Sequence, residues 1–152
     1  MHKHFLCPKH RQWLQQNPQA AKHHLSDTQE TAQYYRDRGR WLDALPYLGC
    51  AYETAELVLA NLGGDKQTAV ITFTSAAILL ADTYHKVLME EKSIEIYDLA
   101  QRRLQAEFFL CYQDTALQAC IKDCIKALHK GAGIQQYIAG IDPQPEAMSL
   151  FH

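Results

Sequence analysis

The stretch from Thr28 to Leu62 constrains the fold of this chain most, because its pattern fits two helices folded against each other. Apolar residues of its second half, from Leu48 to Leu62, recur at the three- and four-residue spacing of one helix face. Gly39 can adopt the left-handed backbone that ends the first helix. The glycine pair after Leu62 ends the second one. The sequence therefore predicts a helical hairpin at this place.

N-capping signals predict where the helices begin. Ser26 with Gln29, and Thr115 with Gln118, have the spacing of a capping box, in which two side chains satisfy free backbone N–H groups. The expected helices cover residues 26–38, 43–62 (capped by Asp43), 65–89 (capped by Asp65), 93–110 and 115–130 (ended by Gly131 and Gly133), preceded by short helices over residues 9–16 and 18–24. The chain is therefore predicted to be all-α, with antiparallel helical hairpins.

Three regions follow from this pattern. Residues 1–25 form a histidine-rich head, residues 26–131 a helical repeat domain of about five helices, and residues 132–152 a C-terminal tail extended by its prolines. A chain of 152 residues fits one domain with a real core.

Composition excludes several classes of function. The formal net charge of -2 gives no excess of Lys and Arg, so we expect no direct binding of nucleic acid. No apolar run approaches the roughly 20 residues that span a bilayer, and the N-terminus has no apolar core of signal-peptide length. The five cysteines are odd in number and match no disulfide framework. We therefore expect a cytoplasmic protein that does not contact membranes.

The hairpin pattern recurs later in the chain with an offset of 49 residues, as from Ala32 to Ala81. The two copies have the same spacing of small and large residues. The small residues let helices approach, and the larger ones fill the space between hairpins. The matching positions are Ala32, Tyr35, Gly39, Trp41, Ala44, Leu48 and Ala51 with Ala81, Tyr84, Leu88, Glu90, Ser93, Tyr97 and Ala100.

This pattern resembles the tetratricopeptide repeat, which has a Trp, a small residue and a Tyr in its first helix and ends on a Pro. Thr28 and Ala77 stand at the Trp positions, and Glu56 and Gln105 replace the Pro. Without that proline the second helix can continue, which accounts for an offset longer than the family's repeat of about 34 residues. The resemblance implies a short stacked array, and an unrelated helical bundle is the alternative. Since two repeats seldom suffice, the helix over 115–130 would cap the stack, or a homodimer would extend it.

The resemblance also implies a binding surface lined by the first helix of each hairpin. Such domains bind peptides or helices of partner proteins there. The matching outward positions are Gln33, Arg36, Asp37, Asp82, His85 and Lys86. This mixed-charge set would hold a polar peptide, and the alternative is a solvated helix face.

Four potential metal ligands lie within nine residues of the head: His2, His4, Cys7 and His10. Zn²⁺ takes four nitrogen or sulfur ligands, but a single peptide rarely closes such a site, and no second ligand pair of the usual spacing follows. We therefore expect no metal and no other cofactor.

The tail carries the sequence Ala-Met-Ser-Leu-Phe. It resembles the short peptides that bind the bacterial replication sliding clamp, with Glu146 where their pattern has Gln. The resemblance implies that Met148, Leu150 and Phe151 would be the anchors.

Enzyme motifs are absent, since the sequence contains no P-loop, no GxGxxG and no GxSxG pattern. The leading hypothesis is therefore a non-enzymatic adaptor or regulator that binds a partner protein or peptide. The alternative is an accessory protein that binds the replication clamp through its tail.

Overall fold

The computed structural model describes residues 4–61 and 64–139, with side chains as far as residue 133. The described part contains six helices and no strand, so the prediction of an all-α chain is confirmed. They are α1 (Pro8–Gln16), α2 (Pro18–Asp37), α3 (Trp41–Ala60), α4 (Lys66–Lys86), α5 (Glu90–Leu110) and α6 (Thr115–Ala139). None of these helices is both long and apolar enough to cross a membrane.

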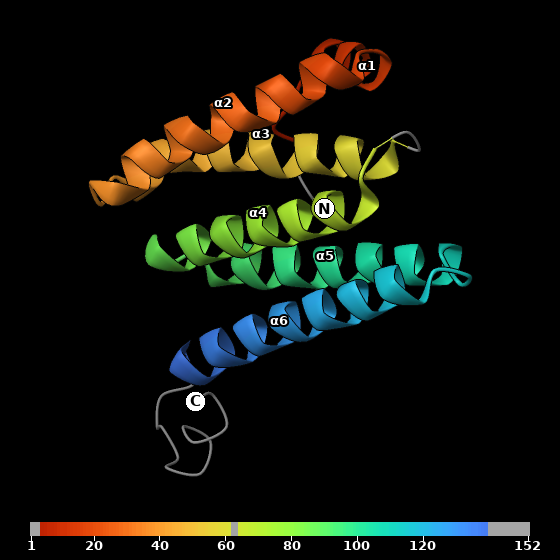
Figure 1. The fold of residues 1–152 in the computed structure, drawn as a ribbon. Coiled ribbons are helices and arrows are strands. Elements are labelled where there is room, and N and C mark those ends of the chain that lie inside the picture. The colour runs from red at the N-terminus through yellow and green to blue at the C-terminus, as the bar shows by residue number, and fades with distance from the viewer. Residues whose placement is uncertain (1–3, 62–63, 140–152) are drawn as a thin grey trace.

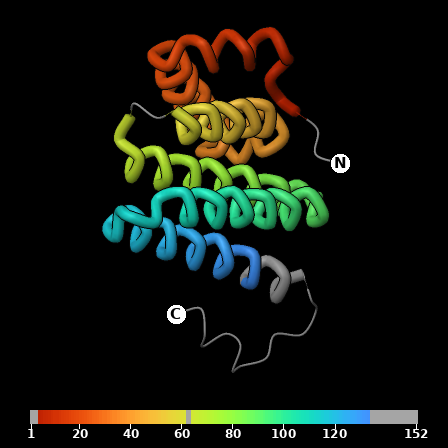
Figure 2. Tube along the Cα trace, turned by 90° about the vertical axis from the view of Figure 1, so that its right-hand side faces the viewer, coloured from red at the N-terminus to blue at the C-terminus, as the bar shows by residue number. Residues whose placement is uncertain are grey.

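The helices are stacked in chain order, from α1 at one end of the molecule to α6 at the other (Figure 1). Each of the long helices packs against the next one in the chain, and α4 also packs directly against α6. α1 lies across the start of α2 and contacts α3 as well. The stack is therefore an array of antiparallel helices, with α1 and α6 at its ends (Figure 2).

Two hairpins, α2–α3 and α4–α5, repeat each other in helix length and position. When 49 is subtracted from the bounds of α4 and α5, they become 17–37 and 41–61, which match those of α2 and α3 within one residue. Four small residues predicted to let the helices approach are fully buried: Ala32, Ala44, Ala81 and Ser93. The Ser93 hydroxyl also donates a hydrogen bond of 2.7 Å to the Ala81 carbonyl, which ties α5 to α4.

The turns of the two hairpins have the same backbone conformation. In the first, Gly39 has a φ of +69° and Arg40 N–H donates to the Tyr35 carbonyl over 2.9 Å. In the second, Leu88 has a φ of +63°, and Met89 N–H donates to the Tyr84 carbonyl, also over 2.9 Å. The internal repeat therefore extends to the hydrogen bonds of the turn, although only one copy has glycine.

Replacing Leu88 with glycine is expected to raise the free energy of unfolding. A left-handed conformation costs an L-residue roughly 1–2 kcal/mol. The greater chain entropy of glycine in the unfolded state offsets about 0.5–1 kcal/mol of this, so the net gain is up to about 1.5 kcal/mol. Leu88 is 86% exposed, so little packing is lost. Urea denaturation measures the change. The reverse substitution, Gly39→Leu, should lower stability, and a loss in Leu88→Gly would contradict the assignment of strain.

α4 forms the centre of the core, as its apolar composition predicts. Ten of its residues between Ala69 and Tyr84 are buried, and Phe73 packs its ring 5.4 Å from that of Tyr52 on α3. The largest side chains that are fully buried with them are Leu48, Leu59, Leu80, Ile96, Leu104, Ile121 and Leu128. One continuous core therefore runs from α2 to α6.

The predicted start of a helix at Ser26 is wrong. α2 begins at Pro18 and runs without a break to Asp37, so the predicted boundary between residues 25 and 26 falls inside a helix. Buried Ala21 and Leu25 continue the apolar face of α2 back towards Pro18, and this packing keeps the segment helical. Ser26 and Gln29 are therefore free to line a surface instead of capping a helix.

Several other boundaries differ by a few residues. α3 begins at Trp41, and its Asp43 pairs with Arg40 (2.7 Å) instead of capping the helix. α5 begins at Glu90, and α6 is capped by Asp114, whose carboxylate accepts the N–H of Leu117. The Asp65 cap of α4 is confirmed, although α4 ends at Lys86.

Gly131 does not end α6, which continues to Ala139. A Cβ at Gly131 would lie 2.9 Å from the hydroxyl of Tyr97, so this glycine allows α6 to approach α5 closely within the helix.

Candidate functional site

Arg36, predicted to line a peptide-binding surface, connects the two hairpins. Its guanidinium pairs with Asp82 on α4 over 3.0 Å and donates further hydrogen bonds to Thr83 and to the Leu79 carbonyl. The side chain of Arg36 is only 15% exposed. Arg36 and Asp82 are thus brought together, but as a link that holds the C-terminal ends of α2 and α4 side by side.

The other predicted surface residues lie around this link. Lys86 and Arg36 both lie against the ring of Trp41, at 5.6 and 5.3 Å from its centroid. His85 pairs with Glu90 at the start of α5, over 2.5 Å.

Gln33 and Asp37 remain on the exposed face of α2, where the amide of Gln33 donates to the carboxylate of Asp37 over 2.6 Å. These two side chains, together with that of Lys86, are the exposed part of the predicted surface.

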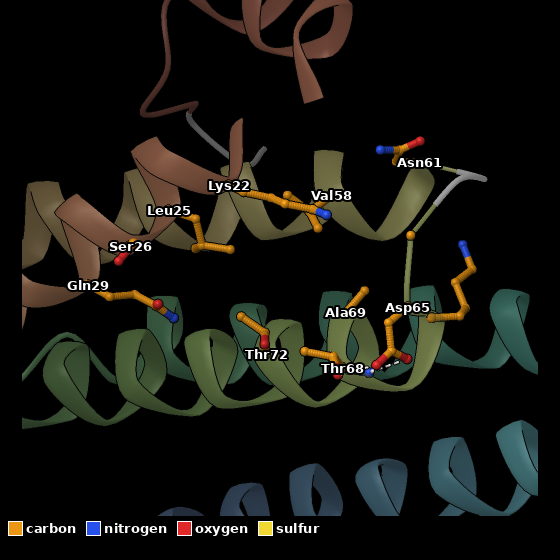
Figure 3. A pocket seen from close by; sticks show the side chains of 12 residues that line it. Lys22, Leu25, Ser26, Gln29, Val58, Asn61, Asp65, Thr68, Ala69 and Thr72 are labelled. Carbon is orange, nitrogen blue, oxygen red and sulfur yellow. Dashed lines mark hydrogen bonds between the residues drawn. The ribbon is translucent and has the colours of Figure 1, made fainter. Parts of the chain in front are cut away.

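A cleft opens between α2 and α4 nearer their N-terminal ends. It has a volume of about 370 Å³, within the range of roughly 300–1,000 Å³ typical of ligand sites. Figure 3 shows Leu25 and Gln29 pointing from α2 towards α4, with Thr72 facing them from the opposite wall. The end of α3 closes the cleft with Val58 and with Asn61, the residue that follows the helix.

The walls of this cleft combine an apolar floor with neutral polar groups. Leu25, Val58 and Ala69 supply the floor. Side chains that can both donate and accept hydrogen bonds surround it: Ser26, Gln29, Asn61, Thr68 and Thr72. Such walls match the alternating N–H and carbonyl groups of an extended peptide.

The charged residues at the cleft differ in whether another group of the protein already pairs with them. Lys66 is engaged, since its amino group donates to the Leu59 carbonyl and lies 3.6 Å from Glu107. Asp65 is occupied as the cap of α4 through Thr68, and this bonding lowers the pKa of its carboxyl. Lys22 is exposed on the rim, and no carboxylate of the described residues pairs with it. The cleft therefore offers one available positive charge.

The cleft lies on the same helix faces as the predicted residues. On α2, positions 22, 26 and 29 continue backwards from Gln33 and Arg36 at helical spacing, and on α4 positions 68 and 72 precede Asp82 in the same way. Extending this spacing along both helices would have identified the residues of the cleft in the sequence. The predicted helix start at Ser26 prevented this extension, because it ended the helix face before position 22.

The potential metal ligands of the head do not converge. His4 lies 3.5 Å from Glu53, Cys7 accepts the backbone N–H of His10 as the cap of α1, and the ring of His10 packs against that of His24 at 4.8 Å. Within the described residues, no three His, Cys, Asp or Glu side chains gather as a metal site. His2 and the tail anchors Met148, Leu150 and Phe151 lie outside the described residues.

Glu56 provides a pH-dependent test of the packing between α1, α3 and α5. Burial raises the pKa of its carboxyl above the ordinary 4.5, and this outweighs the attraction of Arg11 and Arg103. The folded state therefore holds the proton more strongly, and stability declines as pH rises from 4.5 through the raised pKa. Glu56→Gln should be more stable than the wild type at pH 7, with a smaller difference at pH 4.

Thermal melts of both proteins from pH 4 to pH 8 measure this difference. Glu30→Gln, at an exposed position of α2, controls for the change in net charge. A stability difference that widens towards pH 4 would contradict the expected sign.

Comparison with protein-family models, with curated proteins and with solved structures finds no match to this chain. The helical-repeat character therefore rests on the internal repeat of the chain itself.

Proposed function

We propose that this chain is a non-enzymatic helical-repeat interaction module that binds an extended segment of a partner protein in the cleft between α2 and α4. The observation that carries the proposal is the cleft itself, with its apolar floor and its rim of hydroxyl and amide groups. A short apolar side chain of the ligand fits the floor, and an acidic group of the ligand would pair with Lys22.

The link formed by Arg36 and Asp82 supports this proposal. It fixes α2 and α4 at one end of the cleft, so the walls are held in place before a ligand arrives. A preorganised site saves the entropy of ordering its own groups on binding.

The test is selection from a random peptide library followed by fluorescence polarisation with the selected peptide. Thr72→Trp fills the cleft from a partly exposed position and should weaken binding at least tenfold. Lys22→Glu should disfavour acidic peptides. Glu30→Trp, on α2 but outside the cleft lining, is the matched control and should bind as the wild type does. Equal binding by Thr72→Trp and Glu30→Trp would reject the cleft as the site.

A further inference from the structure

The segment that precedes α1 is held against α3 by a buried carboxylate. This N-terminal strap, residues 4–7, is not helical and passes beside α3 (Figure 2). The backbone N–H of Phe5 donates to one oxygen of Glu53 over 2.9 Å, and that of Leu6 donates to the other over 2.8 Å. Hydrogen bonds to an ionised acceptor are about twice as strong as neutral ones. Glu53 therefore binds the main chain of the strap.

An arginine and a histidine lie beside this carboxylate. The side chain of Glu53 is 1% exposed, and a charge so removed from water requires compensation. Arg11 lies 3.8 Å from one carboxylate oxygen and His4 lies 3.5 Å from the other. Both residues belong to the N-terminal part of the chain, and Arg11 on α1 supplies the compensating charge.

The side chains of Phe5 and Leu6 in the strap pack at two separate places. The ring of Phe5 lies directly on Gly49, one helical turn before Glu53, where a Cβ would overlap the ring. Leu6 is 4% exposed and packs with Leu14 and Ala21. Main-chain hydrogen bonds combined with pockets for side chains are how proteins recognise an extended peptide.

An apolar cavity continues this surface beyond Phe5. It has a volume of about 470 Å³ and is lined mostly by apolar and aromatic side chains, including Phe5, Leu42, Leu45, Tyr84, Met89 and Ile96. Polar side chains of His4, Lys92 and Glu95 complete the lining. The strap therefore occupies one end of a longer apolar surface on α3 and α5.

We propose that the surface of α3 around Gly49 and Glu53 is a second peptide-binding site, occupied in the same molecule by the chain's own N-terminal segment. Its ligand class is an extended segment in which an aromatic residue is followed by an aliphatic one. The strap leaves and re-enters this site without unfolding of the helical array. This site is independent of the cleft between α2 and α4, which is lined by Val58 and Asn61 at the end of α3 instead.

The first test supplies the ligand from outside. The probe is a fluorescein-labelled peptide of residues 1–12 carrying Cys7→Ser, and the receptor is the full chain with Phe5→Ser and Leu6→Ser, which weaken its own strap. This receptor should bind the probe. A tethered segment acts at an effective concentration of about 1 mM, so a probe with a Kd of about 0.1 mM should bind the wild type roughly tenfold more weakly.

Two further variants locate the binding. Adding Gly49→Leu to the opened chain fills the place of the Phe5 ring, and adding Glu53→Gln removes the charge that binds the main chain. Each should reduce probe binding at least tenfold. Failure of the opened, helical chain to bind, or binding that is unaffected by both additions, would overturn the proposal.

Hydrogen exchange on the unmodified full chain tests the same idea without depending on any variant. The amides of Phe5 and Leu6 should be protected, but should exchange at least tenfold faster than core amides of α4 such as that of Phe73. Exchange at the rate of the core amides would show that the strap opens only with global unfolding. Exchange at the rate of an unstructured peptide would show that it is not bound. Either result would overturn the proposal.

Discussion

Replacing Glu53 with alanine is expected to lower the free energy of unfolding by about 1.5–3 kcal/mol, the usual contribution of hydrogen bonds to a charged group. The carboxylate is fully buried and accepts the N–H groups of Phe5 and Leu6. Its removal leaves both donors without their acceptor and takes away one ion-pair partner of Arg11. Because domains are stable by only about 5–15 kcal/mol, the loss should be plain in urea denaturation followed by circular dichroism.

Two comparisons separate the causes of this loss. Glu53→Gln keeps the shape of the side chain but presents one N–H₂ group to a backbone donor, so it should cost less than alanine yet remain destabilising. Glu30→Ala, an exposed carboxylate on α2, should change stability by less than about 0.5 kcal/mol. A loss below about 1 kcal/mol in Glu53→Ala would show that the strap bonds do not stabilise the fold.

Replacing Phe73 with alanine should destabilise the protein by about 3–5 kcal/mol, because a large buried side chain is lost and a cavity remains. Phe73 has no exposed surface, and its ring lies 5.4 Å from that of Tyr52 on α3. The contact between α3 and α4 joins the two hairpins, so the array should lose cooperativity together with stability.

The matched control is Ile71→Ala on the same helix, where the side chain is 52% exposed. It removes a similar apolar group from a position that water already reaches, so we expect a change below about 1 kcal/mol. Thermal and urea unfolding of the two variants make the comparison. Equal losses would contradict the placement of Phe73 at the centre of the core.

The helical hairpins and their repetition could be predicted from local patterns. Gly39 ends α2, the Asp65 cap begins α4, and the offset of 49 residues relates the helix bounds of both hairpins. These features depend on residues close together in the chain, where helical period and capping chemistry act directly. The buried alanines were predictable for the same reason, since helices that approach closely require small side chains.

Helix boundaries were predicted wrongly where contacts between distant segments outweighed the local sequence signals. Ser26 and Gln29 have the spacing of a capping box, yet the burial of Ala21 and Leu25 holds α2 helical from Pro18. Gly131 has the composition of a helix end, yet it lies against Tyr97 in the middle of α6. In both places packing outweighs a propensity of about 1 kcal/mol.

The sequence alone determined that residues such as Arg36 and Asp82 share the outward faces of their helices. Only the tertiary structure decided what covers those faces. α2 and α4 meet at one end, so Arg36 links them, and they separate at the other, so Lys22 and Thr72 border a cleft. Helical period sets the angle at which a side chain leaves its helix. It contains no information about which distant segment lies there. For the same reason, helical period could not predict that the N-terminal strap buries Glu53.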